Sequence, residues 1–208
     1  GATYEDNWLY PADQARFGTE KCDVTAGPHS AVGDFTQYDV HIEPLNGIGA
    51  SLHFEAVVKP YRQGTAVIAL GDNDEFYYTD LSVPNNRVSG TITVNGAPRE
   101  VTGFGYHDHQ WMNIHQMQAW HHWLWGHLST PDYTVLLYDF VASEQFGFTR
   151  VPLFGVMEHT TGDVIFSTDG HFTLDTTLER QEEIGKDFPK VSDYTFTNAD
   201  GTSVELHI

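Results

Sequence analysis

The sequence predicts an all-β protein of antiparallel strands, and three features of the chain support that fold class. Apolar and polar residues alternate at period two, as where Leu52, Phe54 and Ala56 are separated by polar residues, a pattern typical of a strand with one buried face. Asn95-Gly96 and Asp200-Gly201 each stand between two such runs, and these dipeptides favour hairpin turns. Turn residues recur roughly every eight to twelve positions, as in sandwiches and barrels. We therefore expect roughly eleven to thirteen strands in a barrel or sandwich.

Each expected strand is a short run of alternating or β-branched residues bounded by turn residues. In chain order these runs are 38–42, 51–58, 66–70, 75–81, 88–94, 120–128, 134–141, 148–157, 164–167, 171–174, 194–196 and 204–208. Only 176–183 has helical character, and we expect no helix longer than about three turns. Residues 1–30, which contain Pro11, Gly18, Gly27 and Pro28, are expected to be irregular.

The composition excludes several classes of function. Ten basic residues against 29 acidic ones give a formal net charge of −19, which would repel nucleic acid and anionic membrane surfaces. The single cysteine, Cys22, excludes an internal disulfide and a zinc site built from cysteines. No apolar run reaches the ~18 residues of a membrane-spanning helix, so we expect no membrane span. Compartment and oligomeric state stay open.

Histidine and tryptophan are concentrated in one short window. Six of the twelve histidines and four of the five tryptophans lie between positions 107 and 127. Histidine exchanges a proton near neutral pH, and tryptophan supplies apolar walls and a π-face for cations. The window lies midway along the chain and predicts a boundary between two β units, residues 1–113 and 114–208. Because the last expected strand runs to Ile208, we expect the second unit to be incomplete.

The residues from 105 to 111 predict a site with two imidazoles. In an extended chain His107, His109 and Trp111 share one face, and Tyr106, Asp108 and Gln110 share the other. Two imidazoles beside an indole suit acid–base chemistry in an apolar pocket. The His-x-His pair also fits zinc, with His121 or His127 as a third ligand, and histidines bonded to backbone groups in a barrel lining would need no chemical role. Because no complete ligand set is visible, we expect no metal.

Asp139 lies on an expected strand and shares a face of it with Val135, Leu137 and Val141. Such a carboxylate is either solvated at the rim of a sheet or buried, where its pKa would rise toward that of a general acid. Tyr138 points to the opposite face. The two side chains therefore cannot line one pocket unless a bulge intervenes.

Three segments carry a resemblance to a known family. Gly105-Tyr106-His107-Asp108-His109-Gln110-Trp111, Trp123-Leu124-Trp125-Gly126 and Leu137-Tyr138-Asp139 resemble the hydroxyneurosporene synthase/AttH-like family, and 38–42 and 88–96 match it less specifically. This family includes carotenoid 1,2-hydratases, kievitone hydratase and lipocalin-like fungal Diels–Alderases. The chain departs from the family in two ways: Met112 stands where the family usually has glycine, and family members are substantially longer.

The resemblance implies two consecutive antiparallel lipocalin-like β-barrels, with the ligand pocket near their junction. It also implies that His107, His109 and Asp139 protonate an alkene, after which water captures the carbocation. Tyr106, Trp111, Trp123, Trp125 and Tyr138 would bind an apolar isoprenoid or polyketide-like substrate. We therefore expect a cofactor-independent hydratase, a lyase. The alternatives are a Diels–Alderase-like pericyclase of secondary metabolism and a lipocalin-like carrier without chemistry.

Overall fold

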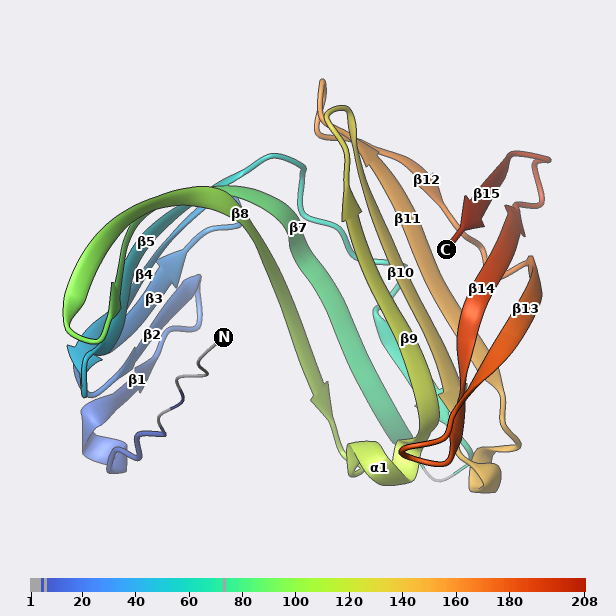
Figure 1. Cartoon of the computed structure of the whole chain (residues 1–208), viewed down its shortest axis with the longest axis horizontal. Helices are drawn as coiled ribbons and strands as arrows, with labels where there is room; N and C mark the ends of the chain where they lie inside the picture. The colour runs from blue at the N-terminus through green and yellow to red at the C-terminus, as the bar shows by residue number, and fades with distance from the viewer. Residues whose placement is uncertain (1–4, 6, 73) are drawn as a thin grey trace. The chain divides into compact units, whose positions relative to one another are not determined.

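The structure is a computed structural model that describes residues 5, 7–72 and 74–208. Within these residues it has fifteen strands, one short α-helix and two 3-10 helices (Figure 1). Strand pairs such as β4–β5 and β13–β14 run antiparallel, so the predicted all-β antiparallel class is confirmed. The chain forms two compact units: unit 1 is Gly1–Ile68, Tyr78–Trp111 and Glu158–Asp163, and unit 2 is Ala69–Tyr77, Met112–Met157 and Val164–Ile208.

One eight-stranded sheet accounts for the first half of the chain. Its order is β1 (Ala15–Phe17), β2 (Cys22–Ala26), β3 (His29–Gly33), β4 (Gln37–Leu45), β5 (Ile48–Ala56), β7 (Glu75–Val94) and β6 (Val67–Leu70), with β8 (Ala97–Met112) also paired to β7. The η1 turn (Ala12–Gln14) precedes β1. The β7–β8 hairpin turns at Asn95 and Gly96, whose φ angles of 53° and 74° fit the hairpin turn predicted for this dipeptide.

Two further sheets lie in the second half of the chain. The four-stranded sheet has the order β12 (Val164–Ser167), β11 (Arg150–Glu158), β10 (Tyr133–Ala142) and β9 (Trp120–Ser129). The three-stranded sheet has the order β13 (Phe172–Gln181), β14 (Lys186–Thr197) and β15 (Ser203–His207). The short helices are α1 (Gln116–Ala119) and η2 (Glu144–Phe146). None of the three sheets closes on itself within the described residues, which is consistent with an incomplete barrel.

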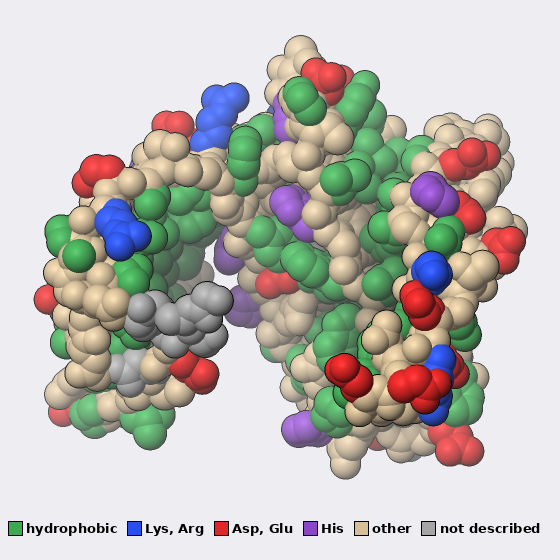
Figure 2. Space-filling view, viewed as in Figure 1, with side chains coloured by type: hydrophobic (Ala, Val, Ile, Leu, Met, Phe, Trp, Pro, Cys, Tyr) green, Lys and Arg blue, Asp and Glu red, His purple; other side chains and the backbone are tan. Residues whose placement is uncertain are grey.

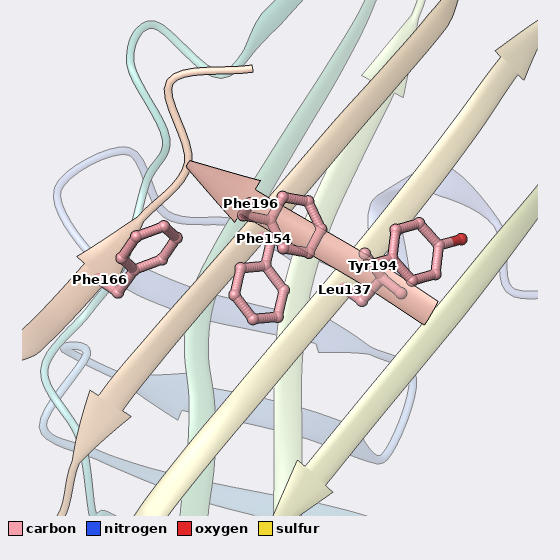
Figure 3. Close-up of a cluster of buried hydrophobic side chains, with 5 residues drawn as sticks. All are labelled: Leu137, Phe154, Phe166, Tyr194 and Phe196. Carbon is pink, nitrogen blue, oxygen red and sulfur yellow. The ribbon is translucent and has the colours of Figure 1, made fainter. Parts of the chain in front are cut away.

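The apolar core of unit 2 lies where these two sheets pack together. Its buried members are Leu137 on β10, Phe154 on β11, Phe166 on β12, and Tyr194 and Phe196 on β14 (Figure 3). The rings of Phe154 and Phe196 stack with centroids 4.1 Å apart and planes 3° apart. The hydroxyl of Tyr194 points away from this stacked pair in Figure 3, which leaves it free to bond elsewhere in the unit.

The surface reflects the composition. On the face drawn in Figure 2, acidic side chains are scattered among apolar and neutral ones and outnumber the basic ones, as expected from the net charge of −19. No helix in the described part of the chain is long and apolar enough to cross a membrane.

Two local predictions are wrong. The segment 176–183, expected to be helical, lies largely in β13, where Thr176 and Thr177 pair with Ser192 and Val191; β-branched residues fit a pleated strand better than a helix. Residues 1–30, expected to be irregular, contain β1, β2 and the start of β3. All five residues of β2 are partly buried, so this strand lacks the alternation between buried and exposed positions that would have revealed it.

The expected strands 75–81 and 88–94 are one 20-residue strand, β7. The intervening segment contains Pro84, and proline donates no hydrogen bond to a ladder. In the structure Pro84 lies beyond Ala56↔Asn86, the last pair of the β5–β7 ladder. The missing N–H therefore removes no bond of that ladder, and the strand continues.

Candidate functional site

The segment with the two imidazoles lies on β8, and a glycine allows β8 to lie close to its neighbours. A Cβ on Gly105 would lie 2.4 Å from Cε1 of Phe54 and 2.7 Å from Cγ2 of Val88. Phe54 and Val88 pair directly across β5 and β7, so their side chains share one face of the sheet. Gly105 places the start of the site segment against this apolar surface.

One face of β8 carries a polar cluster. The hydroxyl of Tyr106 donates to Oδ2 of Asp108 at 2.9 Å, and Nε2 of Gln110 donates to the same oxygen at 3.2 Å. Strand alternation predicted that these three side chains share a face. Tyr106, expected to bind substrate, therefore lies on the face of β8 opposite to the imidazoles.

The other face of β8 carries His107, His109 and Trp111 among aromatic rings. The ring of Tyr38 on β4 lies edge-on to His107, with centroids 4.8 Å apart, and His109 lies edge-on to Trp111 at 5.2 Å. Tyr78 on β7 stacks on Trp111, with centroids 3.6 Å apart and planes 14° apart. Trp111 nevertheless keeps 47% of its surface exposed, so this aromatic face is accessible. We call His107, His109, Trp111 and Tyr78 the β7–β8 face.

Burial changes the proton affinities on the β7–β8 face. Burial lowers the pKa of His107, and the charges of Asp108 and Asp80 oppose that shift. The Nδ1 atom of His107 is buried and has no hydrogen-bond partner among the described residues. Burial also raises the pKa of the Tyr38 phenol to about 12. A neutral imidazole with an unused ring nitrogen can accept a proton or hold a polar ligand.

Asp80 on β7 is a further residue of this face that was not predicted from the sequence. Burial raises the pKa of its carboxyl group, while Arg62, the hydroxyl of Tyr78 and the two imidazoles oppose the rise. The hydroxyl of Tyr78 donates to Oδ2 of Asp80 at 3.5 Å, a long hydrogen bond. The signal available in the sequence was a carboxylate two residues from Tyr78 in an aromatic strand, but its meaning depends on the pairing of β7 with β8.

Asp139 lies in unit 2 and is 3% exposed, so the alternative of a solvated carboxylate at a rim is wrong. Its Oδ2 accepts a hydrogen bond from the hydroxyl of Tyr194 at 2.7 Å, and its Oδ1 lies 3.3 Å from Nε of Arg150. Burial, followed by the bond to Asp139, raises the pKa of Tyr194. Asp139 thus links β10 to β11 through Arg150 and to β14 through Tyr194.

Burial of the His122 ring, followed by the charges of His121 and Arg150, lowers the pKa of His122.

Tyr138 and Asp139 lie on opposite faces of β10. The β9–β10 register is regular from Thr134 to Val141, and its irregularity comes only at Ala142, so no bulge brings the two side chains to one face. Tyr138 stacks on Phe140 at 5.2 Å and lies edge-on to Trp125 at 6.3 Å. Trp125, opposite Tyr138 in the register, and Trp123, opposite Phe140, share the face of Tyr138. They are 45% and 42% exposed.

The predicted site residues therefore form three local groups. His107, His109 and Trp111 lie together in unit 1, with Tyr106 behind them. Asp139 lies on one face of the β9–β10 sheet in unit 2, and Trp123, Trp125 and Tyr138 lie on the other. Among the described residues, no group of three or more His, Cys, Asp or Glu side chains is placed to hold a metal ion.

Comparisons with known proteins show the fold. No model of a known protein family matches the chain, and no curated protein matches it by sequence. An AttH candidate from Nitrosomonas europaea aligns with 91% of this chain at a TM-score of 0.61 and 16% identity. Kievitone hydratase from Nectria haematococca aligns with 86% of it at a TM-score of 0.54 and 13% identity. The chain spans 58% and 55% of the lengths of these two structures. The chain thus shares the β fold of these two structures.

Proposed function

We propose that this chain is a hydratase-type enzyme that adds water across a carbon–carbon double bond of an apolar isoprenoid or polyketide-like substrate. One observation carries the proposal: two imidazoles, one of them partly buried with an unused nitrogen, lie on an accessible aromatic face of unit 1. The similarity in fold to a protein named as a hydratase supports this reaction class.

The proposed chemistry needs an acid, a surface that tolerates positive charge, and a base. His109, which is exposed beside Trp111, donates a proton to one alkene carbon, and the π electrons form the new C–H bond. The oxygen of water then bonds to the cationic carbon and passes a proton to His107. Burial lowers the pKa of His107, so its imidazole is neutral near pH 7 and can accept that proton. His107 then releases its proton to solvent and His109 regains one from solvent, so the net change is addition of one water molecule to the double bond.

The aromatic rings of the β7–β8 face would stabilise the carbocation. The stacked pair of Trp111 and Tyr78 offers a π-face, and a cation over such a face gains on the order of 0.5–2 kcal/mol. Because Trp111 also forms part of the apolar wall, we propose that it contributes to both binding and turnover. In unit 2, the residues predicted to contact the substrate are still Trp123, Trp125 and Tyr138.

Asp139 enters the proposal as a further catalytic residue, as the family resemblance implies. A carboxylate is seldom buried without a partner, and Asp139 is buried with two. Its partners, Tyr194 and Arg150, would also serve a purely structural ion pair. These roles can be separated by measuring both the turnover and the free energy of unfolding of Asp139→Asn. A catalytic role predicts a loss of turnover in a variant that stays folded.

The test is product formation from a panel of polyenes, isoprenoids and kievitone, beside ligand binding measured by quenching of tryptophan fluorescence. We expect hydrated product from the wild type and at least about 100-fold less from His109→Ala, the usual contribution of a general acid. His53→Ala is the matched control, because His53 pairs with Asp39 at 2.7 Å on the opposite face of the unit 1 sheet. Tight binding without turnover of any compound would favour the carrier, and an isomerised product without added water would favour the pericyclase.

A further inference from the structure

Asp80 lies on the same face of its strand as the aromatic ring that covers the site. Residues two apart on β7 point to one side of the sheet, so Asp80 accompanies Tyr78, whose hydroxyl donates to Asp80 Oδ2 at 3.5 Å. The ring of Tyr78 stacks on Trp111 of β8 at 3.6 Å, and Trp111 contacts His109. Because β7 pairs with β8, Asp80 lies on the same side of the sheet as the four residues of the β7–β8 face.

The charged and titratable groups around Asp80 come from several elements. They are Tyr78 on β7, His107 and His109 on β8, Arg62 in the segment between β5 and β6, and Tyr38 on β4. Asp108 also acts on His107, but its side chain bonds to Tyr106 and Gln110 on the other face of β8. Asp80 is thus a carboxylate that faces the imidazoles from the neighbouring strand.

We propose that Asp80 is a positioning residue of the histidine pair, whose negative charge keeps one proton on His107 and His109 together. In the reaction, Asp80 would set the pH range over which His109 can donate its proton. This part of the inference rests on the proposed function. The electrostatic part is a property of the folded chain and can be tested without any substrate.

Asp80, His107 and His109 interact electrostatically and therefore titrate as one coupled set. The negative charge of Asp80 favours the imidazolium form of His107, whereas burial of His107 favours its neutral form. Asp80 acts on both imidazoles, and the burial of His107 is what distinguishes it from the exposed His109.

The test is an NMR titration of the histidine side chains in the wild type, in Asp80→Asn and in Asp39→Asn. We expect Asp80→Asn to lower the midpoints of His107 and His109 by about 0.5–1 pH unit and to leave His53 unchanged. Asp39→Asn is the matched control: it removes the same charge, but beside His53 at 2.7 Å, and should lower only the His53 midpoint. Unchanged His107 and His109 midpoints in Asp80→Asn would overturn the proposal.

Two further measurements test the interaction between Asp80 and the imidazoles. If Asp80→Asn does not fold, the carboxyl carbon of Asp80 can be titrated in wild type and in His109→Gln, because coupling is reciprocal. An unchanged Asp80 titration would then refute it. If the wild type turns over a substrate, Asp80→Asn should move the alkaline limb of the pH–rate profile to lower pH, since the imidazole acid loses its proton earlier. A chain without hydratase activity would still show the NMR shifts, so failure of the proposed function remains distinguishable.

Discussion

Replacement of Gly105 by alanine tests how the site segment is held in the sheet. The added Cβ would lie 2.4 and 2.7 Å from two ring carbons of Phe54 and 2.7 Å from Cγ2 of Val88, about 1 Å closer than the ~3.5–4.0 Å of an ordinary carbon contact. Phe54 stands between Tyr38 and Val88 in the register, so its ring has little room to move. Such overpacking costs about 1–3 kcal/mol, and alanine recovers about 0.5–1 kcal/mol over glycine in a strand. We expect a net loss of roughly 0.5–2 kcal/mol in the free energy of unfolding.

The assay is urea unfolding followed by tryptophan fluorescence, with the free energy of unfolding extrapolated to water. Gly103→Ala is the matched control, because Gly103 lies on the same strand and a Cβ there would meet no atom within 4 Å. We expect this control to equal the wild type or exceed it by about 0.5–1 kcal/mol. If Gly105→Ala were as stable as Gly103→Ala, the close approach of Phe54 to β8 would not constrain the segment, and the reasoning would fail.

Three further predictions follow from the site. His109→Ala and Asp139→Asn should each lower turnover by about 100-fold or more with little loss of ligand binding, whereas Trp111→Ala should impair both; equal loss of binding in all three would contradict these roles. Tyr194→Phe removes a buried hydrogen bond to a carboxylate and should lower the free energy of unfolding by about 1.5–3 kcal/mol, and an unchanged urea midpoint would contradict it. The pKa of His107 is lowered in the folded chain, so protons bind the unfolded chain more readily and stability should fall as pH drops through about 6.5. His107→Gln should weaken that pH dependence, and identical pH profiles would refute the burial argument.

Local patterns in the sequence predicted much of the fold. Alternation and turn dipeptides gave the all-β class and the hairpin at Asn95-Gly96, and strand 164–167 has the same bounds in the structure. The failures came where local propensity and tertiary context disagree. The charged end of β13 resembles a surface helix in sequence, yet Glu179 and Arg180 pair with Phe188 and Asp187 of β14. No property of the segment alone reveals that partner.

From the sequence, the relative positions of site residues could be predicted only within a single strand. The two faces of β8 follow from its alternation, and Asp139 and Tyr138 separate for the same reason. What the sequence could not supply were contacts between distant residues: the bond from Tyr194 to Asp139 spans 55 positions, and Asp80 joins the imidazoles only because β7 pairs with β8. Such contacts depend on strand order, which periodicity does not determine.

The most direct test of the proposed function is incorporation of oxygen from water. The wild type and His109→Ala would each be incubated with the substrate panel in water enriched in ¹⁸O, and the products analysed by mass spectrometry. The account predicts a wild-type product that gains one water molecule carrying the heavy isotope at a carbon of the former double bond, and at least about 100-fold less of it from the variant. A wild-type product without labelled oxygen, or equal labelling by the variant, would contradict acid-catalysed hydration by this site.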